Sequence, residues 1–177
     1  MEFNELIKIR RSMRAYDETK KVTKEQIEEL LKAVQLAPSW KNVQTGRYYV
    51  ILSDEALAKV RAEGLPEFNQ NNSKGAALIV TTYVKGQSGY MGDTPANEMG
   101  EAWGAYDLGL QNAYLVLKAS DMGLDTLIMG IRNSDFLRSE LQIPDEEEVA
   151  AVIAIGYRAK EPVLNKRKDL SEIAKFF

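Results

Sequence analysis

Three arginines and a serine lie within five consecutive residues near the N-terminus. They form Arg10-Arg11-Ser12-Met13-Arg14, here called the arginine segment, which follows a short stretch of helical character. Guanidinium groups bind phosphate through paired, charge-assisted hydrogen bonds, and a serine hydroxyl supplies a further donor. The segment therefore predicts a phosphate site. The alternative is a solvated basic stretch that neutralises acidic residues around it.

Two side-chain amides follow in residues 38–44 (P-S-W-K-N-V-Q), here called the amide loop, between a predicted helix and a predicted strand. Asn42 and Gln44 occupy alternate positions of this loop, and each amide offers both hydrogen-bond donors and an acceptor. Such groups suit the edge of a heterocycle of mixed polarity. An ordinary polar turn, with asparagine in an unusual backbone conformation, explains the same residues without a ligand.

Three further segments have weaker chemical character. Residues 126–130 (T-L-I-M-G) end in a glycine that would let a backbone N–H approach a ligand, or they are the end of a buried strand. Residues 165–168 (N-K-R-K) supply either a second phosphate contact or a soluble basic tail. Residues 145–148 (D-E-E-E) lack the glycine spacing of a calcium loop, which favours a solvated turn.

Histidine and cysteine are both absent from the 177 residues. The sequence therefore has no Ser-His or Cys-His nucleophile pair, no His/Cys zinc site and no histidine as general base. An enzyme of this composition relies on carboxylates, lysine and tyrosine, or on a bound cofactor. Neither a Gly-rich dinucleotide fingerprint nor a P-loop sequence is present, so a nicotinamide would not be held in a Rossmann-type site.

The composition is that of a globular protein and favours a single domain over residues 1–177. Hydrophobic residues make up 45% and charged residues 28%, and the net charge is −3. An acidic chain is unsuited to broad capture of nucleic acid. Residues 1–14 are too charged for a secretion signal, and no stretch has the roughly 20 apolar residues that span a bilayer. We therefore expect a cytoplasmic protein without a nucleic-acid or membrane partner.

Hydrophobic periodicity and end signals place helices and strands around these segments. Thr23 and Gln26 have the spacing of a capping box, which predicts the start of a helix that ends before Pro38. Gly123 is a candidate cap after the longest helix, and Ser134 a candidate cap before a later one. Because helices outnumber strands, the α+β class is favoured. Helices are predicted at 2–9, 23–37, 54–63, 101–120 and 135–141, buried or half-buried strands at 47–53, 76–84 and 149–157, and a mobile loop at 87–99.

Taken together, these segments resemble the nitroreductase family of flavoproteins. The arginine segment looks like the family's R-R-S-x-R, and the amide loop looks like its P-S-x-x-N-x-Q. Each motif alone is weak, but the ordered set covers nearly the whole chain and is specific to the family. Further similarity is found at 68–70 (F-N-Q), at 111–115 with Gly123-Leu124, at 155–157 (I-G-Y) and at the basic pair Lys166-Arg167.

The resemblance implies an α+β fold with a central, mostly antiparallel sheet flanked by helices, and an intertwined homodimer. It also implies two FMN molecules at the subunit interface, each in contact with both chains. Carried over by position, Arg10, Arg11, Ser12 and Arg167 would bind the FMN phosphate, with Lys166 adjacent.

The resemblance assigns the flavin ring to other residues. Arg14 would face the pyrimidine edge, where a cation near N1 and the C2 oxygen favours the anionic reduced ring. Arg14 is thus the one candidate catalytic residue, as an electrostatic stabiliser. The other implied contacts are Asn42, Gln44 and Asn69 at the ring edge, the backbone of Ile128, Met129 and Gly130 near N5, and Pro38, Ser39 and Trp40 around the ring from the partner chain.

The sequence departs from the family pattern at two places. Thr45-Gly46 replaces a frequent Pro-Trp after Gln44, so the wall beside the flavin would be more open. Asn165 replaces a usual lysine, which leaves Lys166 for the phosphate.

The implied activity is a ping-pong transfer of two electrons from NADH or NADPH, through FMN, to a small acceptor such as a nitroaromatic or a quinone. Relatives with this fold also catalyse dehalogenation, heterocycle oxidation or breakdown of the flavin. Residues 87–99 and Trp103 would decide among these reactions. Outside enzymes, the alternative is a non-catalytic nucleotide-binding module that uses the arginine segment.

Overall fold

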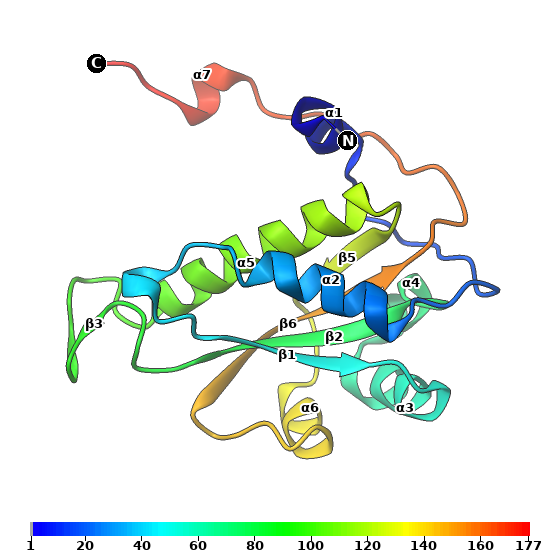
Figure 1. Cartoon of the computed structure of the whole chain (residues 1–177), viewed down its shortest axis with the longest axis horizontal. Coiled ribbons are helices and arrows are strands. Elements are labelled where there is room, and N and C mark those ends of the chain that lie inside the picture. The colour runs from blue at the N-terminus through cyan, green and yellow to red at the C-terminus, as the bar shows by residue number, and fades with distance from the viewer. Residues whose placement is uncertain (1) are drawn as a thin grey trace.

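Four strands form a central sheet in the order β1-β2-β6-β5 (Figure 1). The computed structural model describes residues 2–177, so Met1 lies outside the described residues. Every neighbouring pair of strands in this sheet is antiparallel, as the resemblance implied. The strands are β1 (Gly46–Ile51), β2 (Ala77–Val84), β5 (Asp125–Met129) and β6 (Glu147–Gly156), and a separate hairpin is made by β3 (Tyr90–Met91) and β4 (Thr94–Pro95).

Helices cover both faces of the sheet (Figure 1). α2 and α5 pack on one face, and α3 and α6 pack on the other. No helix within residues 2–177 is long and apolar enough to cross a membrane. The helices are α1 (Phe3–Ile9), α2 (Lys24–Val34), α3 (Asp54–Gly64), α4 (Glu67–Asn72), α5 (Ala102–Asp121), α6 (Ser134–Glu140) and α7 (Leu170–Ile173), with a short 3-10 turn η1 (Trp40–Asn42).

The β2 strand shows why the sheet forms the middle layer. Successive side chains of a strand point to opposite faces. Leu78 and Val80 therefore join the core under α3 and α6, whereas Ile79 joins the core under α2 and α5. All three are fully buried. The prediction of a strand buried on both faces is confirmed.

Most helix ends follow the signals in the sequence. Gln26 N donates to Thr23 Oγ1 (3.3 Å) and Thr23 N donates to Gln26 Oε1 (3.0 Å), so the predicted capping box is confirmed. Gly123 follows α5 with a φ of 74°, a conformation that favours glycine. The predicted cap at Ser134 is wrong, because the Asn133 side chain accepts the capping hydrogen bond and Ser134 is already helical.

Three other details differ from the prediction. Helix α4 was not predicted, and the predicted mobile loop 87–99 contains the β3–β4 hairpin. Glu147, predicted to lie in a solvated turn, begins β6 and is only 5% exposed. It accepts hydrogen bonds from the hydroxyls of Tyr49 and Thr82, which explains how a carboxylate can be buried there.

Candidate functional site

The arginine segment runs along the edge of the sheet. Met13 N donates to the carbonyl of Thr126 in β5 (2.9 Å), and Ser12 pairs with Thr126 in a parallel bridge. The Met13 side chain is buried in the core, whereas Ser12 and Arg14 on either side of it are exposed. This alternation is that of an extended chain. Backbone pairing therefore turns Ser12 and Arg14 outward together.

Arg10, Arg11 and Arg167 bring positive charge from both ends of the chain to one place. Burial lowers the pKa of Arg10, and the positive charges of Arg11 and Arg167 lower it further. Within the described residues, none of the three forms an ion pair with a carboxylate. Lys166 is exposed beside Arg167. A phosphate dianion would relieve this repulsion, so the donors present fit the phosphate end of a cofactor.

The end of β5 presents accessible backbone. Met129 is buried, Ile128 is half exposed, and no atom lies within 4 Å of a Cβ built on Gly130. Asn69 is buried in α4, and its Nδ2 donates to the carbonyl of Ile131 (3.0 Å). Residues 68–70 and the end of residues 126–130, both singled out in the sequence, thus lie next to each other. Residues 126–129 belong to β5, so the interpretation as the end of a strand is confirmed, and the approach of a ligand to the backbone at Gly130 stays a prediction.

The amide loop has a strained backbone. Lys41, Asn42 and Gln44 have positive φ values of 43°, 58° and 52°. Non-glycine residues adopt this region at a cost in free energy and keep it only where the surroundings hold them. Gln44 N donates to Ser39 Oγ (3.1 Å), and Gln44 Nε2 donates to Asn42 Oδ1 (3.2 Å). Strain of this kind is concentrated at binding sites.

A buried carboxylate, not singled out from the sequence, holds the amide loop. Asp107 of α5 is 2% exposed, and its Oδ2 accepts hydrogen bonds from Trp40 N (2.8 Å) and Ser88 Oγ (2.6 Å). The Trp40 ring packs on Trp103, with 5.0 Å between ring centroids. One signal was available: Asp107 lies three positions after Gly104, so both are on one face of the predicted helix 101–120, and a carboxylate on a buried face needs donors.

The predicted site residues fall into two groups toward opposite ends of α5 (Figure 1). The amide loop is bound beside the first turns of this helix, and the arginine segment pairs with β5 just beyond its end. A 20-residue helix is about 30 Å long. The first group is Pro38, Ser39, Trp40, Asn42 and Gln44, and the second is Arg10, Arg11, Ser12, Arg14, Asn69, Ile128, Met129, Gly130, Lys166 and Arg167.

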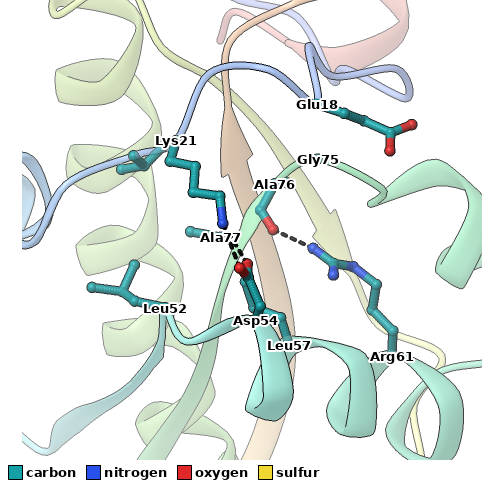
Figure 2. Close-up of a pocket in the computed structure, with 10 residues that line it drawn as sticks. Glu18, Lys21, Leu52, Asp54, Leu57, Arg61, Gly75, Ala76 and Ala77 are labelled. Atoms are coloured by element: carbon teal, nitrogen blue, oxygen red, sulfur yellow. Dashed lines mark hydrogen bonds and ion pairs between the residues drawn. The ribbon is translucent and has the colours of Figure 1, made fainter.

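A separate cavity of about 250 Å³ lies beside residues 18–22 (Figure 2). Lys21 and Asp54 form an ion pair at its wall (2.6 Å), and Arg61 donates to the carbonyl of Ala76. Burial lowers the pKa of Arg61. No residue predicted to bind the cofactor lines this cavity. Lys21, Asp54 and Arg61 at its wall bind one another or the backbone, which is a structural role.

The fold is that of nitroreductase-family proteins, because solved structures of this family match the arrangement of sheet and helices over nearly the whole chain. The chain belongs to the nitroreductase family, since the family described as "Nitroreductase family" matches residues 7–157. The family comprises oxidoreductases, so the protein is an enzyme. The family, fold class and enzyme class predicted from the sequence are confirmed.

Relatives resemble the chain over nearly its whole length. A Bacillus subtilis strain 168 protein named "Putative NAD(P)H nitroreductase YdgI" is 26% identical and covers 99% of this chain and 97% of its own. A nitroreductase family protein from Clostridium difficile 630 has a TM-score of 0.81 at 26% identity and covers 99% and 98%. A "putative nitroreductase in complex with FMN" from Exiguobacterium sibiricum 255-15 has a TM-score of 0.88 at 25% identity and covers 100% and 98%.

Proposed function

We propose that the protein is an FMN-dependent oxidoreductase that passes two electrons from NADH or NADPH to a small acceptor, such as a nitroaromatic or a quinone, in ping-pong order. One relative is named for NAD(P)H nitroreductase activity, and one similar structure is an FMN complex. The observation that carries the proposal is the cluster of Arg10, Arg11 and Arg167. Like charges gathered without a carboxylate among the described residues fit a bound phosphate ester.

One group of residues in this chain binds the phosphate end of the cofactor. Arg10, Arg11 and Arg167 bind the phosphate by charge-assisted hydrogen bonds, and the outward hydroxyl of Ser12 adds a donor. Lys166 adds positive charge beside them. Because phosphate neutralises the repulsion within the cluster, binding stabilises the folded chain.

When bound, FMN supplies the redox chemistry, because its ring takes up a hydride and passes on two electrons. Arg14 is exposed on the same side of the extended chain as Ser12, and it holds a fixed positive charge at the ring edge. The open space at Gly130 allows the flavin ring to approach the backbone closely. Asn69 lies next to this position, because its Nδ2 donates to the carbonyl of Ile131. The absence of histidine is consistent with these roles, since none of them needs a protein base.

We further propose a homodimer in which two chains share each FMN. The amide loop and the arginine segment lie toward opposite ends of α5, so one flavin in contact with both draws them from two chains. The C-terminal tail extends past α1, away from the sheet (Figure 1). This tail exposes several large apolar side chains, which we propose lie against the second chain. The exposed side chains are Val163, Leu164, Leu170, Ile173, Phe176 and Phe177.

The proposed function is tested by flavin absorbance of the purified protein, FMN titration and addition of NADH under nitrogen. We expect a yellow protein whose flavin NADH bleaches. Arg167→Ala should weaken FMN binding by roughly tenfold or more, because hydrogen bonds to charged groups contribute about 1.5–3 kcal/mol. Lys175→Ala is the matched control, an exposed cation of the same tail, and should bind FMN as the wild type does. A colourless protein that ignores FMN would overturn the proposal in favour of a nucleotide-binding module.

The homodimer is tested by sedimentation at decreasing protein concentration with flavin absorbance recorded. Release of FMN should accompany dissociation. A monomer that retains flavin would contradict the shared site.

A further inference from the structure

Asp107 is a buried carboxylate that binds two donors from distant parts of the chain. No cation pairs with it among residues 2–177. Its Oδ2 accepts hydrogen bonds from the Trp40 backbone N–H (2.8 Å) and from the Ser88 hydroxyl (2.6 Å). Hydrogen bonds to an ionised acceptor are roughly twice as strong as neutral ones. An apolar side chain could pack on this helix face but could not accept these two hydrogen bonds, so the carboxylate's distinctive effect is to bind the Trp40 N–H and the Ser88 hydroxyl.

What it holds first is the amide loop. This loop keeps three non-glycine residues at positive φ, so it needs an external attachment. The Trp40 indole Nε1 is buried and has no acceptor within the described part of the chain. The ring is therefore positioned by packing on Trp103 and by the backbone hydrogen bond to Asp107. Without the carboxylate, the Trp40 N–H would lose its partner, and only hydrogen bonds within the amide loop, such as Gln44 N to Ser39 Oγ, would oppose the strain.

The same carboxylate also holds the base of the β3–β4 hairpin. Ser88 precedes this hairpin, and its Oγ lies 3.3 Å from Thr45 Oγ1, just after the amide loop. The end of the 87–99 loop, after β4, is tied to the same place, because Trp103 Nε1 donates to Asn97 Oδ1 (2.9 Å). The amide loop and the hairpin thus form one hydrogen-bonded unit around Asp107.

We propose that Asp107 is a positioning residue, which holds the amide loop in the conformation that contacts the flavin ring and ties that loop to the 87–99 hairpin. This inference rests on the proposed function and names a residue that the family motifs do not include. Asp107 itself touches neither the cofactor nor the acceptor; it acts through the Trp40 backbone and the Ser88 hydroxyl.

The two tryptophans of the chain provide a direct readout. Indole rings whose centroids are 5.0 Å apart and tilted by 53° couple their electronic transitions and give a split band in circular dichroism. The band is recorded in protein stripped of flavin, and Trp103→Phe identifies it by removing it. FMN affinity is then titrated for each variant.

Asp107→Leu should lose the split band and bind FMN about tenfold more weakly, because it leaves buried donors unsatisfied. Asp107→Asn keeps an acceptor oxygen and should retain the band. The matched control is Glu147→Gln, which changes another buried carboxylate on the opposite face of the sheet and should alter neither the band nor the FMN affinity. If Asp107→Leu retains the band, or loses it without weaker FMN binding, the role of Asp107 is overturned.

If Asp107→Leu fails to fold, the test of whether Asp107 holds the amide loop is the thermal melting of Asp107→Asn. Its tryptophan band should melt before the sheet, whereas the two melt together in the wild type; coincident melting in Asp107→Asn would overturn the proposal. The band is measured without cofactor, so a wild type that shows the band but binds no FMN would sink the proposed function separately.

Discussion

Arg158 binds the buried carboxylate of Asp125 through two hydrogen bonds, from Nε to Oδ2 (2.8 Å) and from Nη2 to Oδ1 (2.9 Å). Asp125 begins β5, and Arg158 follows β6 and forms a bridge with Tyr16. The hydrogen bond with Asp125 raises the pKa of Arg158. The pair therefore joins β5 to both the end of β6 and the extended chain that carries the arginine segment.

Arg158→Met should lower the free energy of unfolding by about 2–4 kcal/mol, because it leaves the carboxylate of Asp125 unpaired at 5% exposure. Urea unfolding at pH 7 measures the change. Lys32→Met is the control, since it breaks the exposed ion pair with Glu29 and should leave the urea midpoint unchanged. Equal midpoints for both variants would refute the structural importance of the Arg158 pair.

Alkaline pH should destabilise the protein in part through Tyr49. Burial and the hydrogen bond to Glu147 raise the pKa of Tyr49 from 10.0 to about 12. A raised pKa in the folded state means that the unfolded chain releases its proton first. The associated stability is present below pH 10 and is lost as the pH rises to about 12. Tyr49→Phe should flatten the fall in urea midpoint over this window, and a slope equal to that of the wild type would contradict the assignment.

Gly89→Ala should displace the 87–99 hairpin. Gly89 has a φ of 84°, and a Cβ there would lie 2.5 Å from the Gly100 carbonyl oxygen and 2.6 Å from a Trp103 ring carbon. Because this hairpin lies next to the amide loop, we expect the KM for quinone acceptors to change by several-fold or more. Gly92→Ala has the same kind of backbone, with a φ of 62°, but no atom within 4 Å. It isolates the steric effect, and identical KM changes in both variants would rule that effect out.

Arg14→Ala should slow the bleaching of bound flavin by NADH by roughly tenfold or more, while the dissociation constant for FMN changes less. The reason is that the proposed role of Arg14 is to stabilise negative charge that grows during reduction. Stopped-flow absorbance under nitrogen measures the rate, and Arg14→Lys should recover much of it because the charge is kept. A rate unchanged in Arg14→Ala would remove the residue from this role.

Local order was predictable because its causes are local. The capping box at Thr23 and Gln26, the positive φ of Gly123 and the apolar run of β2 follow from neighbouring residues, and the structure confirms them. The cap at Ser134 failed because two adjacent residues could both accept the same hydrogen bond, and Asn133 does so. The position of Glu147 could not be read from its acidic neighbours, since its partner hydroxyls come from β1 and β2.

For the candidate site, residue types in the chain were enough to indicate a phosphate ligand, a cofactor in place of a histidine base, and the nitroreductase family. The resemblance also predicted that Arg10 and Arg167 serve one phosphate, and Arg167 does act electrostatically on Arg10. Tertiary structure alone decided that the amide loop lies toward the other end of α5 and that Asp107 holds this loop. The physical reason is that these relationships join residues far apart in the chain, such as Trp40 and Asp107 at a separation of 67 residues. Such contacts are set by how helices pack on the sheet, and no local pattern of hydrophobicity or charge encodes them.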